Sequence, residues 1–206
     1  MAARLTRILV LARAPIAGNA KTRLIPALGA AGAARLARVM LWHALDAAIA
    51  ATLGPVALVG DPHPARWGFA FPSEIELSAQ VGADLGERMA AAVERALALG
   101  ETVIVTGTDC PGLVAARISG AALALETHDV AIIPATDGGY VLIGFARFDG
   151  AIFAGVEWGR AEVLAATLAN IATLGWSVWQ GEPLADVDEP ADLIHAPATW
   201  LSGAVR

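Results

Sequence analysis

Lys21 is the only lysine among the 206 residues of this chain, and its loop is suited to binding phosphate. Arg13 and Arg23 flank it, and no acidic residue precedes Asp46, so the positive charge of the loop has no acidic neighbour in the sequence. Gly18 lets the main chain approach an anion closely, and arginine side chains can bind a phosphate through two hydrogen bonds. The loop therefore predicts a site for the phosphates of a nucleotide, with a solvated loop as the alternative.

Acidic residues gather in two later segments, and carboxylate oxygens are the ligands that Mg²⁺ and Mn²⁺ prefer. Asp109 follows the apolar segment 102–107 and precedes a proline, so it is either a metal ligand or the cap of the next helix. Asp186 and Asp188 precede a predicted helix and are free to bind a cation. Asp192 instead fits the acidic first turn of that helix. Asp109 and Asp188 together could form a two-carboxylate metal site.

Segment 137–140, Asp-Gly-Gly-Tyr, has both a structural and a functional interpretation. Paired glycines are typical of a tight turn between two strands, because such turns need a positive φ or a close approach of the main chain. In the functional interpretation, Asp137 and Tyr140 face a second substrate across the glycines.

Segment 80–89 is similarly open to two interpretations. Asp84 and Glu87 have the spacing of a capping box, which is a sufficient structural reason for both acids. Arg88 follows them directly and is not explained by capping. It is therefore a candidate for binding a nucleotide.

The composition excludes several classes of function. The chain is 56% hydrophobic with a formal net charge of −6, and a general nucleic-acid binder would need a basic face rather than one basic loop. The single cysteine, Cys110, excludes an intramolecular disulfide and suits a reducing compartment. The apolar segment 8–12 is too short for a signal peptide or a membrane span. We therefore expect one cytoplasmic domain, 1–206, with no membrane or nucleic-acid partner.

Short β-rich segments alternate with alanine-rich helical patterns along the chain, which predicts an α/β fold with a parallel sheet. We expect strands at residues 7–12, 55–60, 74–78, 102–107, 129–134, 140–145 and 176–180. We expect helices at residues 30–51, 84–99, 113–126, 160–174 and 190–195. Ligands of such sheets bind outside the carboxyl ends of the strands, so the candidate residues could converge there.

Six segments, taken in order, resemble a known bacterial family. They are ARAPIAGNAKTRL, DLGERMAAA, GTDCP, DGGYVLIG, VEWG and DVDEPADL, and they extend from about residue 8 to residue 193. The family was long carried as a domain of unknown function and is placed in the GT-A-like nucleotide-diphospho-sugar transferase superfamily. The resemblance implies a three-layer α/β/α fold with a mostly parallel mixed sheet.

That superfamily includes 2-phospho-lactate guanylyltransferase, molybdopterin guanylyltransferase and the sugar-acid cytidylyltransferases, in which a basic loop holds the triphosphate and two aspartates hold Mg²⁺. The resemblance implies Mg²⁺ or Mn²⁺ as the cofactor, bound by Asp109 and Asp188, with Lys21, Arg23 and Asp109 as catalytic residues. The other implied positions are Arg13, Gly18, Gln80, Gly82 and Arg88 for the nucleotide, and Asp137, Gly138, Gly139, Tyr140 and Trp158 for the acceptor.

The resemblance specifies the family more closely than the reaction. We expect nucleotidyl transfer from a nucleoside triphosphate to a small anionic acceptor, with release of pyrophosphate. Members of the family are commonly named glycosyltransferases, including ones linked to arsenosugar biosynthesis, so transfer from a nucleotide sugar with Asp137 as base is the alternative. A non-catalytic nucleotide-binding module is a third. We expect tryptophans such as Trp176 and Trp179 to pack in the core, with an acceptor pocket or a dimer face as the alternatives, which leaves a homodimer open.

Overall fold

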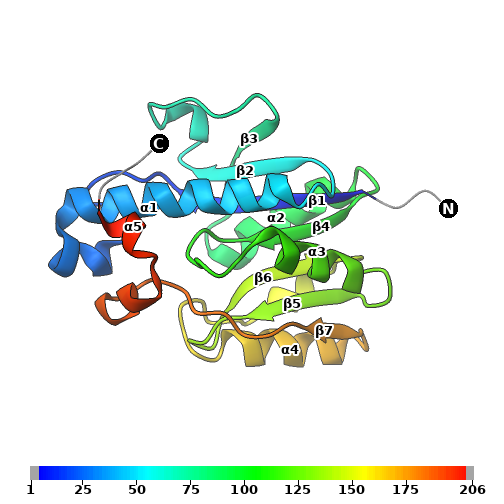
Figure 1. Cartoon of the computed structure of the whole chain (residues 1–206). Coiled ribbons are helices and arrows are strands. Elements are labelled where there is room, and N and C mark those ends of the chain that lie inside the picture. The colour runs from blue at the N-terminus through cyan, green and yellow to red at the C-terminus, as the bar shows by residue number, and fades with distance from the viewer. Residues whose placement is uncertain (1–4, 203–206) are drawn as a thin grey trace.

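The structure is a computed structural model that describes residues 5–202, and its centre is a seven-stranded sheet (Figure 1). The strand order is β3-β2-β1-β4-β6-β5-β7. Every pairing between neighbouring strands is parallel except the two made by β6, which runs antiparallel to β4 and β5. The strands are β1 (Thr6–Arg13), β2 (Val56–Asp61), β3 (Ile75–Ala79), β4 (Thr102–Thr106), β5 (Val130–Pro134), β6 (Tyr140–Phe145) and β7 (Val178–Gln180).

Helices cover both faces of the sheet and form the outer two of three layers (Figure 1). Buried side chains of α1 and α3 pack on one face, and those of α2 and α4 pack on the other. The α-helices are α1 (Ile25–Ala50), α2 (Leu85–Leu97), α3 (Ala115–Ala124), α4 (Val163–Thr173) and α5 (Ala198–Leu201). Four 3-10 helices, η1 (Thr22–Leu24), η2 (Pro64–Arg66), η3 (Gly150–Phe153) and η4 (Pro190–His195), lie in the connections.

Strand β1 shows why the sequence forms this sheet. Seven of its eight residues are buried, as expected for a central parallel strand that is covered on both faces. Ile8 and Val10 face the helix layer of α1, and Leu9 and Leu11 face the layer of α2. The predicted α/β fold with a mostly parallel mixed sheet is therefore confirmed, and all seven predicted strands are present within a few residues of their expected positions.

Two predicted helices differ from those observed. The helix expected at 30–51 begins earlier, because the chain continues from Ile25 across a kink at Gly29, where φ is 71°. The segment 190–195 is a 3-10 helix rather than an α-helix. Pro190 begins it and Pro197 follows it closely, so too few residues remain to complete several α-helical turns.

Helix α1 is long and apolar enough to cross a membrane when it is judged by length and composition alone: residues 22–50 include a window of mean hydropathy 1.4. In this structure its residues Leu41, Leu45 and Ala48 pack in the core against the sheet. A core helix passes the same test, so this observation is weak evidence for a membrane span.

The C-terminal segment returns to the beginning of α1. In Figure 1 the red helix α5 lies next to the blue part of α1, and the two helices are in contact. Leu24, Met40, Val187 and Ala196 form a small buried cluster between the two regions. This packing brings the acidic segment around Asp188 next to the loop that follows β1.

Candidate functional site

A cavity of about 650 Å³ opens at the carboxyl ends of β1 and β4. Ligand sites of open α/β sheets lie at this edge, so the position agrees with the sequence-based expectation. The polar residues that line the cavity are Arg13, Asn19, Lys21, Thr22, Arg23, Gln80, Asp84, Arg88, Thr106, Thr108, Asp109, Asp137, Tyr140, Asp186 and Asp188.

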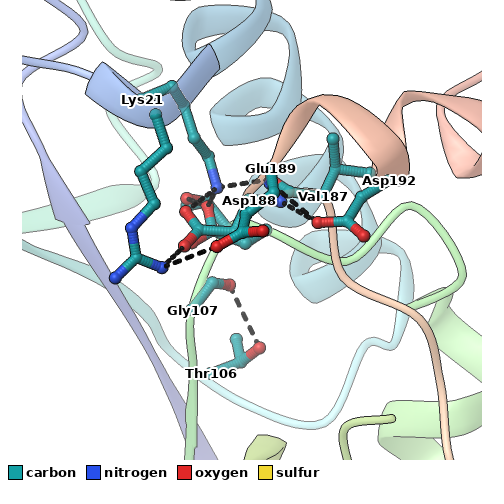
Figure 2. Close-up of polar contacts among 10 residues, drawn as sticks. Lys21, Thr106, Gly107, Val187, Asp188, Glu189 and Asp192 are labelled. Atoms are coloured by element: carbon teal, nitrogen blue, oxygen red, sulfur yellow. Dashed lines mark hydrogen bonds and ion pairs between the residues drawn. The ribbon is translucent and has the colours of Figure 1, made fainter. Parts of the chain in front are cut away.

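The ammonium group of Lys21 joins the two predicted metal ligands. Its Nζ lies 2.9 Å from Asp109 Oδ1 and 3.5 Å from Asp188 Oδ1, and it donates a 2.7 Å hydrogen bond to the carbonyl of Val187 (Figure 2). The Lys21 side chain is only 7% exposed, although both aspartates remain about half exposed. Three residues that are far apart in the sequence therefore form one charged cluster.

The main chain holds this cluster in place on both sides. Lys21 has φ 48° and ψ 47°, a left-handed conformation that costs a non-glycine residue about 1 kcal/mol. Its carbonyl accepts a hydrogen bond from Leu24 N, at the end of η1, which fixes the turn. On the opposite side, Val187 N donates to Asp109 O at 2.8 Å. The loop after β4 and the C-terminal segment are thus tied directly together.

Asp188 is held by a second cation and by a helix cap. Arg23 Nη1 lies 2.6 Å from Asp188 Oδ2, and the Arg23 side chain is 62% exposed. Asp192 Oδ2 accepts hydrogen bonds from the main-chain N–H groups of Glu189 and Asp188, at 2.7 and 3.1 Å. These bonds lower the pKa of Asp192, and they confirm the structural role expected for that residue.

Asp109 and Asp188 fit a divalent cation. In the described part of the chain, no three His, Cys, Asp or Glu side chains cluster so that they could hold a metal by themselves. Mg²⁺, however, commonly binds through one or two carboxylates, with substrate phosphates and water completing its shell. The ammonium group of Lys21 already occupies the place of a cation between these two carboxylates.

Cys110, next to Asp109, is a packed core residue. The thiol is buried, and burial raises its pKa to about 11. A nucleophilic cysteine would need a lowered pKa, so the surroundings of Cys110 favour a packing role over a nucleophilic one.

A second polar group forms the other end of the cavity around Arg88. Its guanidinium contacts Asp61 Oδ2 at 3.3 Å, Gln80 Oε1 at 3.4 Å and the carbonyl of Gly82 at 3.1 Å. Asp61 was not among the predicted site residues, although it follows a predicted strand in the same way as Asp109. The criterion that pointed to Asp109, an aspartate that follows a predicted strand, would therefore also have pointed to Asp61.

Gln80 is fixed by the ends of two strands. Its Nε2 donates to the carbonyls of Ala12 and Val59, at 2.9 and 3.1 Å. Both amide hydrogens are thus used within the protein, and the amide oxygen accepts from Arg88. This arrangement gives Gln80 a role in holding β1, β2 and Arg88 together.

The predicted capping box at the start of α2 is only half correct. Asp84 Oδ1 accepts from Glu87 N at 2.9 Å, as expected. Glu87, however, accepts from Ala83 N at 2.8 Å rather than from Asp84 N. Gly82, which precedes Ala83, has φ 141° and lies close to Glu87. This conformation brings Ala83 N, in place of Asp84 N, within reach of the Glu87 carboxylate.

The turn between β5 and β6 is the predicted glycine turn. Asp137 Oδ1 accepts from Gly139 N at 2.9 Å. Gly138 has φ 94°, and a Cβ atom there would lie 2.1 Å from the carbonyl of Ala161, so only glycine fits. Asp137 also faces the half-buried Asp186, whose pKa is raised by burial and by the nearby charge of Asp137.

Two residues expected at the acceptor site point into the core. The Tyr140 hydroxyl is buried near Thr167, and burial raises its pKa, although part of the residue lines the cavity. Trp158 packs on Gly86 and on Phe153, with 5.7 Å between the ring centroids of Trp158 and Phe153. Of the described residues proposed for the site, Gly18, Gly82, Gly138 and Trp158 are not among those that line the cavity.

Comparison with known proteins identifies a matching family and a similar solved structure. The model of a family described as "Uncharacterized protein conserved in bacteria (DUF2064)" matches residues 44–160. A solved structure of a candidate nucleotide-diphospho-sugar transferase from Desulfovibrio desulfuricans G20 is similar with 31% sequence identity and a TM-score of 0.87. The match covers 94% of this chain and 87% of that one. No curated protein matches the chain.

More distant structures share the fold. CMP:2-keto-3-deoxy-manno-octonic acid synthetase in complex with CTP is 14% identical with a TM-score of 0.54, over 92% of this chain and 95% of that one. Rv0371c from Mycobacterium tuberculosis H37Rv, in complex with manganese, is 16% identical with a TM-score of 0.53, over 93% of this chain and 97% of that one. At these identities the likeness shows the fold alone.

Proposed function

This chain belongs to the bacterial family DUF2064, and we propose that it is a metal-dependent transferase that uses nucleotides. The reaction we favour is nucleotidyl transfer from a nucleoside triphosphate to a small anionic acceptor, with release of pyrophosphate. The D. desulfuricans relative is described as a candidate nucleotide-diphospho-sugar transferase, which supports the use of a nucleotide as donor.

One observation carries the proposal: Lys21 Nζ lies within 3.5 Å of both Asp109 and Asp188 at the edge of a large cavity. A lysine, an arginine and two carboxylates at one point provide both positive charge for a polyphosphate and oxygen ligands for a metal. The arrangement requires three separate segments of the chain to meet. A purely structural ion pair would have no need of the adjoining cavity.

In the proposed reaction an ionised acceptor attacks the α-phosphorus in line and pyrophosphate leaves. Lys21 and Arg23 bind the polyphosphate and neutralise the charge that develops on the leaving group. Asp109 and Asp188 would hold Mg²⁺ or Mn²⁺, which would supply Lewis-acid stabilisation of the phosphoryl oxygens. An acceptor that is already ionised needs no general base, so the cavity contributes mainly position and charge.

The experiment that tests this function is release of pyrophosphate. The protein is incubated with each nucleoside triphosphate, Mg²⁺ and a panel of phosphorylated and phosphonate acceptors. Asp109→Asn should lower the rate by about 1,000-fold or more, because one charge of the metal site is lost. Asp149→Asn is the matched control, since Asp149 caps η3 and does not line the cavity. Equal rates in wild type and Asp109→Asn would contradict the assignment of Asp109.

Glycosyl transfer from a nucleotide sugar is the second candidate. The exposed Asp137 at the cavity favours it, because an acceptor hydroxyl needs a carboxylate base whereas an ionised phosphate does not. Release of a nucleoside diphosphate from nucleotide sugars, without pyrophosphate release from triphosphates, would support this candidate. We also propose a cytoplasmic location, since the single cysteine is a free buried thiol.

A further inference from the structure

The two carboxylates of the proposed metal site already hold a cation. The ammonium nitrogen of Lys21 is 2.9 Å from Asp109 Oδ1 and 3.5 Å from Asp188 Oδ1. A divalent ion bound by both aspartates has to approach the same pair of oxygen atoms at much shorter range. The ammonium group and the metal therefore compete for one position.

Lys21 is built to remain there while the cavity holds no anion. Its side chain is 7% exposed, and besides the two carboxylates its ammonium group contacts a main-chain carbonyl, that of Val187, to which it donates a hydrogen bond. Its left-handed backbone is held by the turn that begins η1. These contacts fix the ammonium group more firmly than a flexible surface lysine would be fixed.

Lys21 and Arg23 oppose the negative charges of Asp109 and Asp188, while Asp186 and Glu189 lie close by. The ammonium group therefore already neutralises part of the negative charge that would attract a divalent cation arriving alone. A metal bound to a triphosphate arrives as a net anion. Both basic residues line the same cavity as the aspartates, so a polyphosphate there could accept their hydrogen bonds.

We propose that Lys21 competes with the divalent cation for Asp109 and Asp188, so that the metal binds with the polyphosphate and not before it. When the polyphosphate enters, the Lys21 ammonium group moves from the carboxylates to a phosphate oxygen, and the carboxylates become free for the metal. This inference rests on the proposed function, because it requires a polyphosphate ligand. It adds to the proposed function that the metal binds together with the polyphosphate, and that Lys21 sets this order.

The test measures Mn²⁺ binding to the full chain without any nucleotide, by the electron paramagnetic resonance signal of free Mn²⁺. Lys21→Met removes the charge and keeps a long side chain. It should bind Mn²⁺ at least about tenfold more tightly than wild type, because an opposing charge close to the metal is gone. Arg117→Met is the matched control. Arg117 pairs with Glu182 at the surface and does not line the cavity, so this variant should leave the affinity for Mn²⁺ unchanged.

A second measurement uses wild type alone, so the test does not depend on the folding of a variant. A non-hydrolysable nucleoside triphosphate should strengthen Mn²⁺ binding to the wild-type protein beyond what the free nucleotide binds. Equal affinity of Lys21→Met and wild type for Mn²⁺ would overturn the inference, as would tight Mn²⁺ binding by wild type without nucleotide. Neither measurement involves turnover. Absence of pyrophosphate release would therefore count against the proposed reaction and leave the competition intact.

Discussion

Arg7 and Lys21 lie at opposite ends of β1, and each is a buried cation held by two carboxylates. Arg7 contacts Glu76 and Glu101 where the strand begins, and its side chain is 9% exposed. Lys21 follows the end of the strand and is 7% exposed. The same pattern of one cation and two acids therefore occurs twice in the sheet.

The surroundings of the two clusters are different. Glu76 is 59% exposed and Glu101 is 13% exposed, and none of the residues of the Arg7 cluster lines the cavity. Asp109 and Asp188 are 47% and 39% exposed, and both line the cavity. A closed cluster, which lies away from the cavity, stabilises the fold, whereas an open cluster, which lines the cavity, can exchange its partners for a ligand. Position at the cavity, rather than exposure of the carboxylates, thus distinguishes the two clusters.

The largest effect is expected at the closed cluster. Arg7→Met removes the buried cation that contacts Glu76 and Glu101, which should lower the free energy of unfolding by about 3 kcal/mol. Urea denaturation measures this change, and calorimetry should show triphosphate binding at the wild-type affinity. Arg117→Met breaks an exposed pair instead and should cost less than about 1 kcal/mol. Weaker triphosphate binding in Arg7→Met would remove the distinction between the two ends of β1.

At the open cluster, we expect a substitution to weaken triphosphate binding strongly and to change the free energy of unfolding little. Lys21→Ala should weaken triphosphate binding in the presence of Mg²⁺ by about 100-fold, since charge-assisted hydrogen bonds to phosphate are lost. Its free energy of unfolding should change by less than about 1 kcal/mol, because water can solvate the half-exposed aspartates. Titration calorimetry and urea denaturation of the same variant give both values. Unchanged triphosphate affinity would show that the cluster is structural.

The open cluster was easier to predict from the sequence than the closed one. Lys21 and Asp109 follow strands, and residues after parallel strands meet at one edge of the sheet. Asp188 joins them because the C-terminal segment packs on α1, and the resemblance of motifs supplied that pairing. Arg7 lies within a strand, so its partners depend on which strands are neighbours. The sequence patterns did not specify the strand order, including the position of β6 between β4 and β5.

The direction of side chains was the least predictable property. Residues 137–140 form the expected turn, yet the hydroxyl of Tyr140 is buried in the core. Trp158 likewise packs on Gly86. Whether a loop residue points toward a cavity or toward the core depends on how elements distant in the sequence pack around it. A local sequence pattern does not predict that packing.

Gln80 offers a sharper test of how the other end of the cavity is organised. Gln80→Leu removes the acceptor that orients Arg88, so nucleotide affinity should fall about tenfold. If Gln80 acts through Arg88, the same change in an Arg88→Met background should have little further effect. A double-mutant cycle measured by calorimetry decides the point. Additive losses would mean that Gln80 contacts the nucleotide itself.

The smallest effect is expected at Asp192, which supports Asp188 from the opposite side to Arg23. Its pKa lies below the ordinary value of 3.8, because main-chain N–H groups stabilise the carboxylate. A group whose pKa is lowered on folding stabilises the protein above its unfolded pKa, and this contribution disappears as the pH falls through the folded value. Asp192→Ala should therefore be less stable than wild type by up to about 1 kcal/mol at neutral pH.

Thermal unfolding between pH 7 and pH 2 measures how that difference depends on pH. The gap between wild type and Asp192→Ala should be constant down to about pH 4 and should narrow below it, because the wild-type carboxylate then becomes protonated. Asp149→Ala, which removes another exposed aspartate cap, controls for general effects of acid. If the difference in stability between wild type and Asp192→Ala persists at pH 2, the Asp192 side chain stabilises the protein through its shape rather than through its charge. Asp188 would then be held mainly by Lys21 and Arg23, and loss of those cations should displace it.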